Sequence, residues 1–168
     1  QSLNLKNVFF VNKKKINEII SKNSLVENYK VSKVYPSTLV VAVNQTNLLA
    51  KINKDGNILI IGSNGKFIEN SYDKKHLPFI FGSPQAQDFL KFKKILDDSK
   101  IPYNQIKNFY FFPSKRWDIE LKNNTILKLP KDHVKESLDN AFNFLNDKNF
   151  KELKIDDVRV MNQIIIND

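Results

Sequence analysis

The stretch from Trp117 to Leu129 constrains the fold of this chain more than any other. Large apolar residues alternate with charged ones over Trp117–Lys122, and the alternation resumes at Thr125 after Asn123-Asn124. A period of two residues places apolar and charged side chains on opposite faces of a β-strand, and an Asn-Asn pair favours a tight turn. The sequence therefore predicts an antiparallel hairpin with one face in the core and the other in water.

Other segments rich in Val, Ile and aromatic residues are bounded by turn signals, which is typical of strands. We expect strands over residues 29–34, 38–45, 48–52, 58–61, 66–68 and 106–112, and two more near the end of the chain over 155–160 and 163–166. Tight turns at Lys54–Asn57 and Gly62–Gly65 separate three of them. Most of these connections are short, so the sheet should be mainly antiparallel.

Three amphipathic helices are expected between these strands, with N-caps at Asn12, at Ser83 (followed by Pro84) and at Asp132. Helical spacing assigns their buried faces to Ile16, Ile19 and Ile20; Phe89, Leu90, Phe92 and Leu96; and Val134, Leu138, Ala141, Phe142 and Leu145. The predicted fold class is α+β: a small helix-plus-hairpin unit, then a strand-rich unit with two helices. A boundary near residue 50 is plausible.

The composition argues against most kinds of catalytic site. The 168 residues are 41% hydrophobic and include no cysteine, which excludes a disulfide scaffold, a thiolate zinc site and a cysteine nucleophile. The two histidines, His76 and His133, lack metal-ligand spacing, and no Gly-x-Ser-x-Gly motif is present. Gly62–Lys66 does not have the spacing of a phosphate loop. We therefore expect no catalytic residues, metal or cofactor, although an isolated acid in a cleft stays conceivable.

The net charge of +9 allows two kinds of anionic partner, nucleic acid or a membrane surface. The run Phe109–Phe112 before Lys115-Arg116 would suit base stacking. However, only 2 of the 27 basic residues are Arg, and abundant Lys, Asn and Ile are typical of an AT-rich genome. Residues 1–84 carry 12 Lys and 5 acids, or +7. We favour no nucleic-acid partner and leave contact of this half with an anionic membrane open.

Neither a membrane span of about 18 apolar residues nor a signal peptide is visible. The chain opens at Gln1 instead of Met, so we expect it to be part of a longer protein with any targeting or anchoring segment upstream.

Several short motifs follow one another along the chain. Val26, Val31, Pro36 and Leu39 are similar to the V-x-x-x-x-V-x-x-x-x-P-x-x-L pattern of the second half of a POTRA domain. Further on come the LP-x-x-x-G motif of Leu77–Gly82, the RW-x-x-x-L motif of Arg116–Leu121, and Asp157–Arg159, which is similar to D-L-R. In this order the motifs resemble those of the FtsQ/DivIB family of bacterial division proteins, and the resemblance covers nearly the whole chain.

This resemblance implies a single-pass inner-membrane protein, with this fragment on the periplasmic side. Residues 1–50 would be a POTRA-like domain that lacks its first strand and helix, and residues 51–168 would be the β domain. Two departures concern the partner surface: Asn44–Ala50 replaces a Glu-Arg and P-x-A stretch, and Val160 stands where an aromatic residue is common.

The resemblance also implies a non-enzymatic scaffold for the small division proteins FtsB and FtsL, which bind by strand addition at the last strand of the β domain. We name this segment the terminal edge; it comprises Arg159, Val160, Met161, Asn162, Gln163, Ile164, Ile165 and Ile166. An uncovered Ile-rich edge would be prone to aggregation, which itself favours a partner. The alternatives are a buried terminal strand and, for function, a POTRA-bearing envelope protein in outer-membrane protein transport or assembly.

Overall fold

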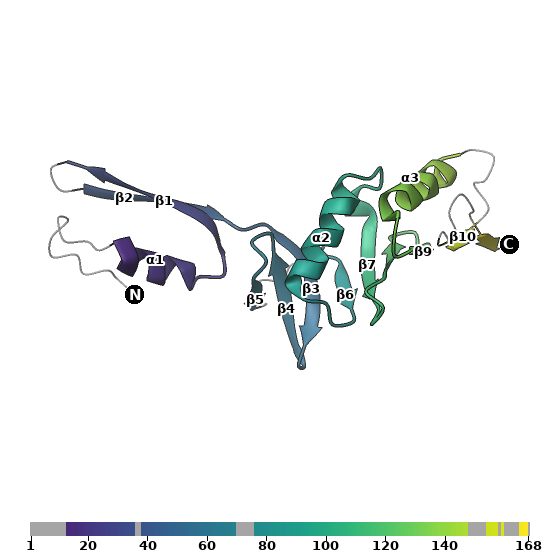
Figure 1. Cartoon of the computed structure of the whole chain (residues 1–168), viewed down its shortest axis with the longest axis horizontal. Helices are drawn as coiled ribbons and strands as arrows, with labels where there is room; N and C mark the ends of the chain where they lie inside the picture. Colours follow the sequence, from purple (N-terminus) through teal and green to yellow (C-terminus); the bar gives the residue numbers. More distant parts are fainter. Residues whose placement is uncertain are drawn as a thin grey trace.

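The computed structural model describes residues 13–35, 38–69, 76–147, 154–157, 159 and 165–167. The molecule is elongated (Figure 1), with a helix and a hairpin at one end, a seven-stranded sheet covered by two helices in the middle, and two short strands near the C-terminus. The predicted α+β class with a mostly antiparallel sheet is confirmed.

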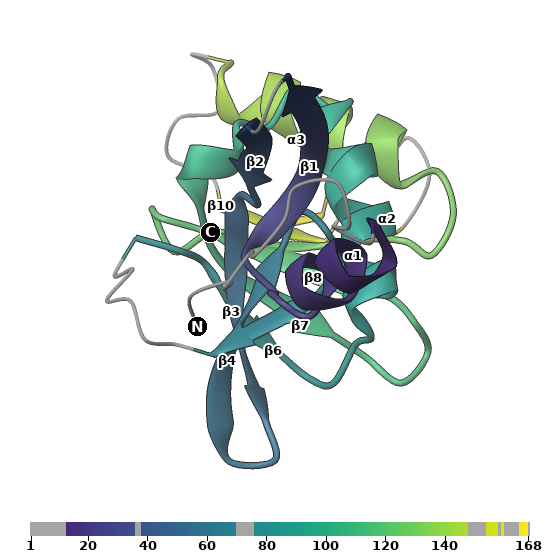
Figure 2. The ribbon, with the colours of Figure 1, turned by 90° about the vertical axis from the view of Figure 1, so that its left-hand side faces the viewer.

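The first helix and hairpin form at the predicted places, but the buried face predicted for the helix is wrong at Ile19, whose side chain is 44% exposed. A separate two-stranded sheet offers too little apolar surface to bury the whole face. Helix α1 spans Lys13–Ser21, and strands β1 (Val26–Val34) and β2 (Thr38–Gln45) pair antiparallel as a separate two-stranded sheet. The proposed cap Asn12 and the turn residues Pro36-Ser37 lie outside the described residues. Seen along the long axis in Figure 2, α1 and this hairpin lie in front of the larger sheet.

The turn after the fourth strand connects this unit to the larger sheet. The Asn64 side-chain amide donates to the carbonyl oxygens of Ser24 (2.9 Å) and Val26 (3.0 Å). The Ser63 hydroxyl donates to the Glu27 carboxylate over 2.8 Å. Gly62–Lys66, which superficially resembles a phosphate loop, is therefore a β-turn whose side chains bind the start of β1.

The seven-stranded sheet has the order β5-β4-β3-β6-β7-β8-β9. Its strands are β3 (Leu48–Lys54), β4 (Asn57–Gly62), β5 (Phe67–Glu69), β6 (Phe79–Phe81), β7 (Ile106–Phe111), β8 (Trp117–Leu121) and β9 (Ile126–Lys128). The short strand β6 runs parallel to both β3 and β7, whereas every other pair in this sheet is antiparallel. Strand β3 runs through residue 50, and the domain boundary there stays a prediction.

Helices α2 (Ala86–Asp97) and α3 (Val134–Leu145) cover one face of the sheet, and a 3-10 turn at Tyr103–Gln105 leads into β7. Both helices begin later than predicted. Neither Ser83 nor Pro84 is in α2; the N-cap is Gln85, whose backbone N–H binds the Asp88 carboxylate. Acids near a helix N-terminus are favourable, and Asp88 supplies this interaction in the first turn of α2.

The predicted cap of α3 was also wrong. The N-cap is His133 instead of Asp132, and its backbone is left-handed, with φ of 58°. Its imidazole lies 3.1 Å from the Glu136 carboxylate. The Asp139 carboxylate accepts the backbone N–H of Lys100 at 2.7 Å, which ties α3 to the segment that follows α2. These contacts orient the start of α3 without a side-chain cap.

Aromatic residues fill the space between the helices and the sheet. The rings of Phe92 and Trp117 stack with centroids 4.9 Å apart, and Phe89 meets Phe109 edge-on at 5.3 Å. Phe109 is fully buried. The apolar stripes predicted for α2 and α3 face this core at Phe89, Phe92, Leu96, Leu138 and Ala141.

The opposite face of β8 differs from the prediction of a wet surface. Strand β8 is buried along its whole length, including Asp118 (5% exposed) and Glu120 (8% exposed). The reason is its place between β7 and β9, where long side chains from the neighbouring strands cover its polar face. The alternation correctly assigns the two faces but does not show what covers them.

Candidate partner-binding edge

Two short strands near the C-terminus form the candidate site. β10 (Lys154–Asp157) and β11 (Ile165–Asn167) pair antiparallel, with Ile155 opposite Ile166 and a register shift before Asp157. β10 lies beside β9, at the end of the large sheet (Figure 1). Among the described residues, β11 pairs with β10 alone, and no described strand pairs with its other side.

The predicted terminal edge is described only in part. Ile165 and Ile166 lie in β11, and the Ile165 side chain is 47% exposed. Arg159 is exposed and lies outside both strands, so the strand predicted over 155–160 does not continue through it. The other predicted contact residues, 160–164, lie outside the described residues.

Arg159 is electrostatically coupled to β8. The Nε atom of Arg116 lies 3.3 Å from Asp118 Oδ1, which also accepts the backbone N–H of Leu129 at 3.1 Å. Burial raises the pKa of the Asp118 carboxyl, whereas the Leu129 N–H and the Arg116 guanidinium act in the opposite direction. The positive charge of Arg159 also lowers this pKa, so it lies within electrostatic reach of Asp118. Arg159 and Arg116 thus both favour the charged form of Asp118.

A second polar cluster lies on the same face of β8. The Glu120 carboxylate accepts hydrogen bonds from Lys107 Nζ (2.7 Å), Asn108 Nδ2 (2.8 Å) and the Tyr110 hydroxyl (2.7 Å). These bonds, with that of Lys107 the strongest, lower the pKa of Glu120 to about 2. Burial and the bond to Glu120 raise the pKa of Tyr110. The charged form of Glu120 thus stabilises the pairing of β7 with β8.

We expect the charged Glu120 carboxylate to stabilise the protein, so that the free energy of unfolding falls at acid pH. Its folded pKa of about 2 is below its ordinary value of 4.5. Its contribution is therefore complete above pH 4.5 and is lost as the pH falls through about 2. Because Lys107 is half exposed and screened by solvent, this contribution should be about 1–2 kcal/mol.

Urea unfolding at pH 7, pH 4 and pH 2.5 would measure this effect. Glu120→Gln should show a smaller loss of unfolding free energy between pH 7 and pH 2.5 than the wild type. Glu69→Gln, at an exposed position in β5, is the matched control and should follow the wild type. Equal acid sensitivity in Glu120→Gln and wild type would contradict the assignment.

The described residues contain no group of three or more His, Asp or Glu side chains that could hold a metal ion. In the same part of the chain, no helix combines the length and the hydropathy needed to cross a bilayer.

The comparison with known families decides the assignment. Residues 42–160 match the family model described as "Cell division protein FtsQ/DivIB, C-terminal". The chain belongs to the FtsQ/DivIB cell-division family. The matched region includes β3 to β10 and Arg159, which confirms the resemblance seen in the short motifs.

Individual relatives of the chain carry the names of the same family. The chain is 25% identical over 115 residues to cell division protein FtsQ of Rhizobium radiobacter, which covers 67% of this chain and 55% of the relative. It is 27% identical over 165 residues to cell division protein DivIB of Clostridium botulinum strain Loch Maree, covering 88% and 64%. The chain spans about a third to two thirds of the length of the curated relatives it matches.

One solved structure is similar to part of the chain: the major extracytoplasmic domain of the trans isomer of DivIB from Geobacillus stearothermophilus. The identity is 10%, the TM-score is 0.38, and the match covers 49% of this chain and 76% of that one.

Sequence reasoning missed the burial of Asp118 and Glu120 and the electrostatic effect of Arg159 on Asp118. Asp118 and Glu120 were assigned to a wet face. The spacing of Arg116 and Asp118 could have indicated the pairing, because residues two apart on a strand share a face. The proximity of Arg159 could not be inferred, since about forty residues separate it from Asp118 and no local pattern links them.

Proposed function

We propose that this chain is the extracytoplasmic part of a membrane-anchored, non-enzymatic scaffold of the division machinery. On this proposal it binds FtsB- and FtsL-type division proteins by strand addition at the terminal edge, Arg159–Ile166. The POTRA-like residues 1–50 then lie nearest the inner membrane, where their excess of lysine can meet anionic lipid head groups. Membership of a cell-division family supports the general role.

The observation that carries this proposal is the edge position of β11. This strand pairs on one side with β10, and Ile165 on it remains about half exposed. In an added strand, main-chain hydrogen bonds supply affinity and alternate side chains supply register. The positive charge of Arg159, which acts on the buried Asp118, supports the proposal further, because it gives the predicted edge a charged residue that can steer an acidic partner.

The test is calorimetry of the full chain with the extracytoplasmic segments of the cognate FtsB- and FtsL-type proteins. Successive N–H groups of a strand point to opposite sides. Of the variants Ile165→Pro and Ile166→Pro, one therefore removes an N–H donor from the side of β11 that faces β10, and the other removes an N–H donor from the opposite side. We expect each proline variant to weaken binding at least tenfold, and Ile164→Pro to do the same.

The matched controls are Ile165→Val and Ile166→Val, which keep the N–H and the β-branched side chain and should bind as the wild type does. Circular dichroism and thermal unfolding check that each variant is folded. Folded proline variants with unchanged affinity would place the contact elsewhere. A well-folded wild-type chain that binds neither partner would remove the proposal.

A further inference from the structure

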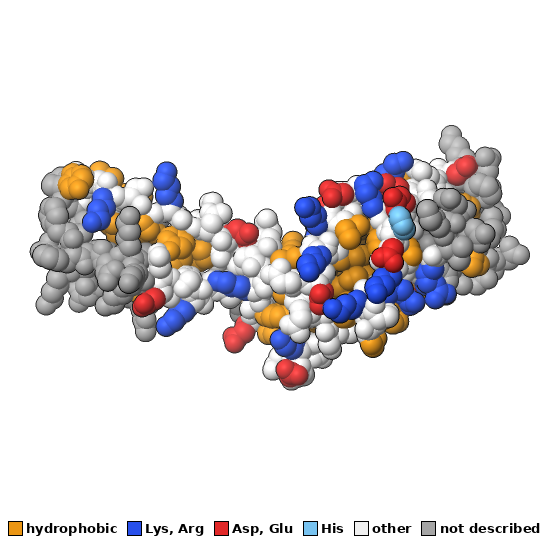
Figure 3. Space-filling view, viewed as in Figure 1, with side chains coloured by type: hydrophobic (Ala, Val, Ile, Leu, Met, Phe, Trp, Pro, Cys, Tyr) orange, Lys and Arg blue, Asp and Glu red, His pale blue; other side chains and the backbone are white. Residues whose placement is uncertain are grey.

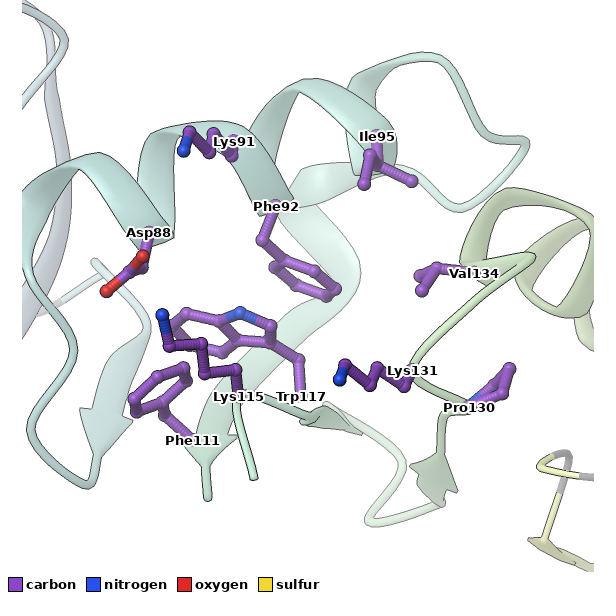
Figure 4. Close-up of a pocket in the computed structure, with 10 residues that line it drawn as sticks. All are labelled: Asp88, Lys91, Phe92, Ile95, Phe111, Lys115, Trp117, Pro130, Lys131 and Val134. Atoms are coloured by element: carbon purple, nitrogen blue, oxygen red, sulfur yellow. The ribbon is translucent and has the colours of Figure 1, made fainter. Parts of the chain in front are cut away.

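A groove on the helical side of the molecule lies away from the terminal edge. It opens between α2, the turn that follows β7, and the segment that leads into α3 (Figure 4), and it encloses about 180 Å³. We name it the lysine-rimmed groove, after Lys91, Lys115 and Lys131. Figure 3 shows basic side chains around exposed apolar surface in this region.

Aromatic rings form the floor of the groove. Phe92 and Trp117 stack there with an angle of 15° between their planes, and Trp117 is 7% exposed. Phe111 packs against Trp117 with ring centroids 4.7 Å apart. Ile95 and Val134, both partly exposed, add apolar walls. The floor is therefore a recessed apolar surface that can receive one large side chain.

The charge at the rim is positive. Within the described part of the chain, none of the three rim lysines forms an ion pair. In contrast, Lys93 on α2 pairs with Asp97 at 2.5 Å, and Lys135 on α3 pairs with Asp139 at 2.6 Å. Asp88 is the one acid that lines the groove, and its carboxylate already accepts the N–H of Gln85. A negatively charged ligand in the groove would therefore meet three lysine side chains without acidic partners among the described residues, around a floor of mostly buried aromatic rings.

The turn that carries Lys115 is held in place by its own contacts. The backbone of Lys115 is left-handed, with φ of 62°, and its N–H donates to the Phe112 carbonyl at 2.8 Å. The Arg116 guanidinium stacks on the Phe112 ring at 4.4 Å. In Figure 4, Lys91 lies on α2 above the aromatic rings, Lys115 lies beside Trp117 and Phe111, and Lys131 lies near Pro130. An ordered turn reduces the entropy that ligand binding must overcome.

We infer that the lysine-rimmed groove binds an acidic segment of a partner protein that inserts one large apolar side chain between the lysines. The volume is below the range of about 300–1,000 Å³ that is usual for small-molecule sites. A membrane surface fits less well, because the recessed Trp117 cannot enter a bilayer. This inference does not depend on the strand-addition proposal, because the two sites share no residue.

Trp117 offers a direct readout, since it is the single tryptophan in the chain. The probe is a five-residue peptide with a central phenylalanine flanked on each side by two glutamates, titrated into the full chain at low salt. We expect a saturable change in Trp117 emission, and an increase in anisotropy when the peptide carries a fluorophore. A peptide with glutamine in place of glutamate should bind at least tenfold more weakly.

The variant that tests the site is the double substitution Lys115→Gln with Lys131→Gln, which should weaken binding of the acidic peptide about three- to tenfold. Lys94→Gln, at an exposed position on α2 outside the groove, is the matched control and should bind as the wild type does. All are surface changes, and circular dichroism confirms their folding.

Three outcomes would overturn the inference: no peptide binding in either readout, equal binding of the glutamine peptide, or unchanged affinity in the double variant. Vesicles of phosphatidylglycerol and of phosphatidylcholine provide the membrane arm. A change in Trp117 emission with the anionic vesicles alone, lost in the double variant, would assign the groove to lipid and reject the peptide. The β11 proline variants test the strand-addition proposal separately, and they should bind the acidic peptide as the wild type does.

Discussion

Replacing Phe109 with alanine is expected to lower the free energy of unfolding by about 3–5 kcal/mol, the usual cost of removing a large aromatic side chain from a core. Phe109 is fully buried, and its ring contacts those of Phe89, Phe92, Tyr103 and Trp117 at centroid distances of 5.3–6.3 Å. The substitution removes the centre of this cluster and leaves a cavity that the rigid sheet cannot close. Domains of this kind have a total stability of about 5–15 kcal/mol, so much of it would be lost.

Urea unfolding followed by Trp117 emission gives this free energy by linear extrapolation. Phe81→Ala is the matched control on the neighbouring strand. Phe81 is 45% exposed, and its ring contacts those of Phe79 and Tyr110 at centroid distances of 4.9 Å and 5.1 Å. Loss of the Phe81 ring should lower the free energy of unfolding by about 1 kcal/mol. If both variants were destabilised equally, the core would not be centred on Phe109.

The elements of the fold that could be predicted from sequence are those with a clear period. The alternation over 117–129 predicts the β8–β9 hairpin, and the helical stripes predict which sides of α2 and α3 face the core. Such patterns are reliable because burial of apolar surface dominates folding and acts on every residue of a periodic segment. The antiparallel β1–β2 and β3–β4 pairs follow from the short turns between them.

Other parts of the fold depend on neighbours that the sequence does not show. β6 has three residues, too few for a period, and its parallel pairing with β3 and β7 requires contacts across long separations. The start of α3 was misplaced because capping preferences are averages, and His133 adopts a left-handed backbone instead. The sequence also did not predict the lysine-rimmed groove, because Lys91, Lys115 and Lys131 come from three separate segments that only the fold brings together.

Of the predicted terminal edge, the sequence placed Ile165 and Ile166 in a strand, and the structure agrees. It could not show that Arg159 lies near Asp118, because a single charged residue has no local signature of its partner. The contact assignments along this edge stay predictions. Their strongest physical basis is the side of β11 with which no described strand pairs, since unpaired main-chain groups can bind any added strand of suitable register.

Replacing Gly82 with alanine is the second change from which we expect a large effect, a loss of about 2–5 kcal/mol of unfolding free energy. Gly82 ends the Leu77–Gly82 motif directly after β6, and its φ is 101°. A Cβ atom at this position would lie 2.3 Å from the backbone carbonyl oxygen of Phe111. Backbone atoms cannot rotate away as a side chain can, so the pairing of β6 with β7 would have to shift.

Gly56→Ala separates the two causes of this loss. Gly56 also has a positive φ, of 84°, but a Cβ atom there would meet nothing within 4 Å. This variant should therefore show only the backbone cost, about 1 kcal/mol, and the excess in Gly82→Ala measures the clash with Phe111. Equal losses in both variants would mean that β6 and β7 separate easily. A larger loss for Gly82→Ala would explain why the tripeptide strand β6, flanked by two parallel neighbours, ends at a residue without a side chain.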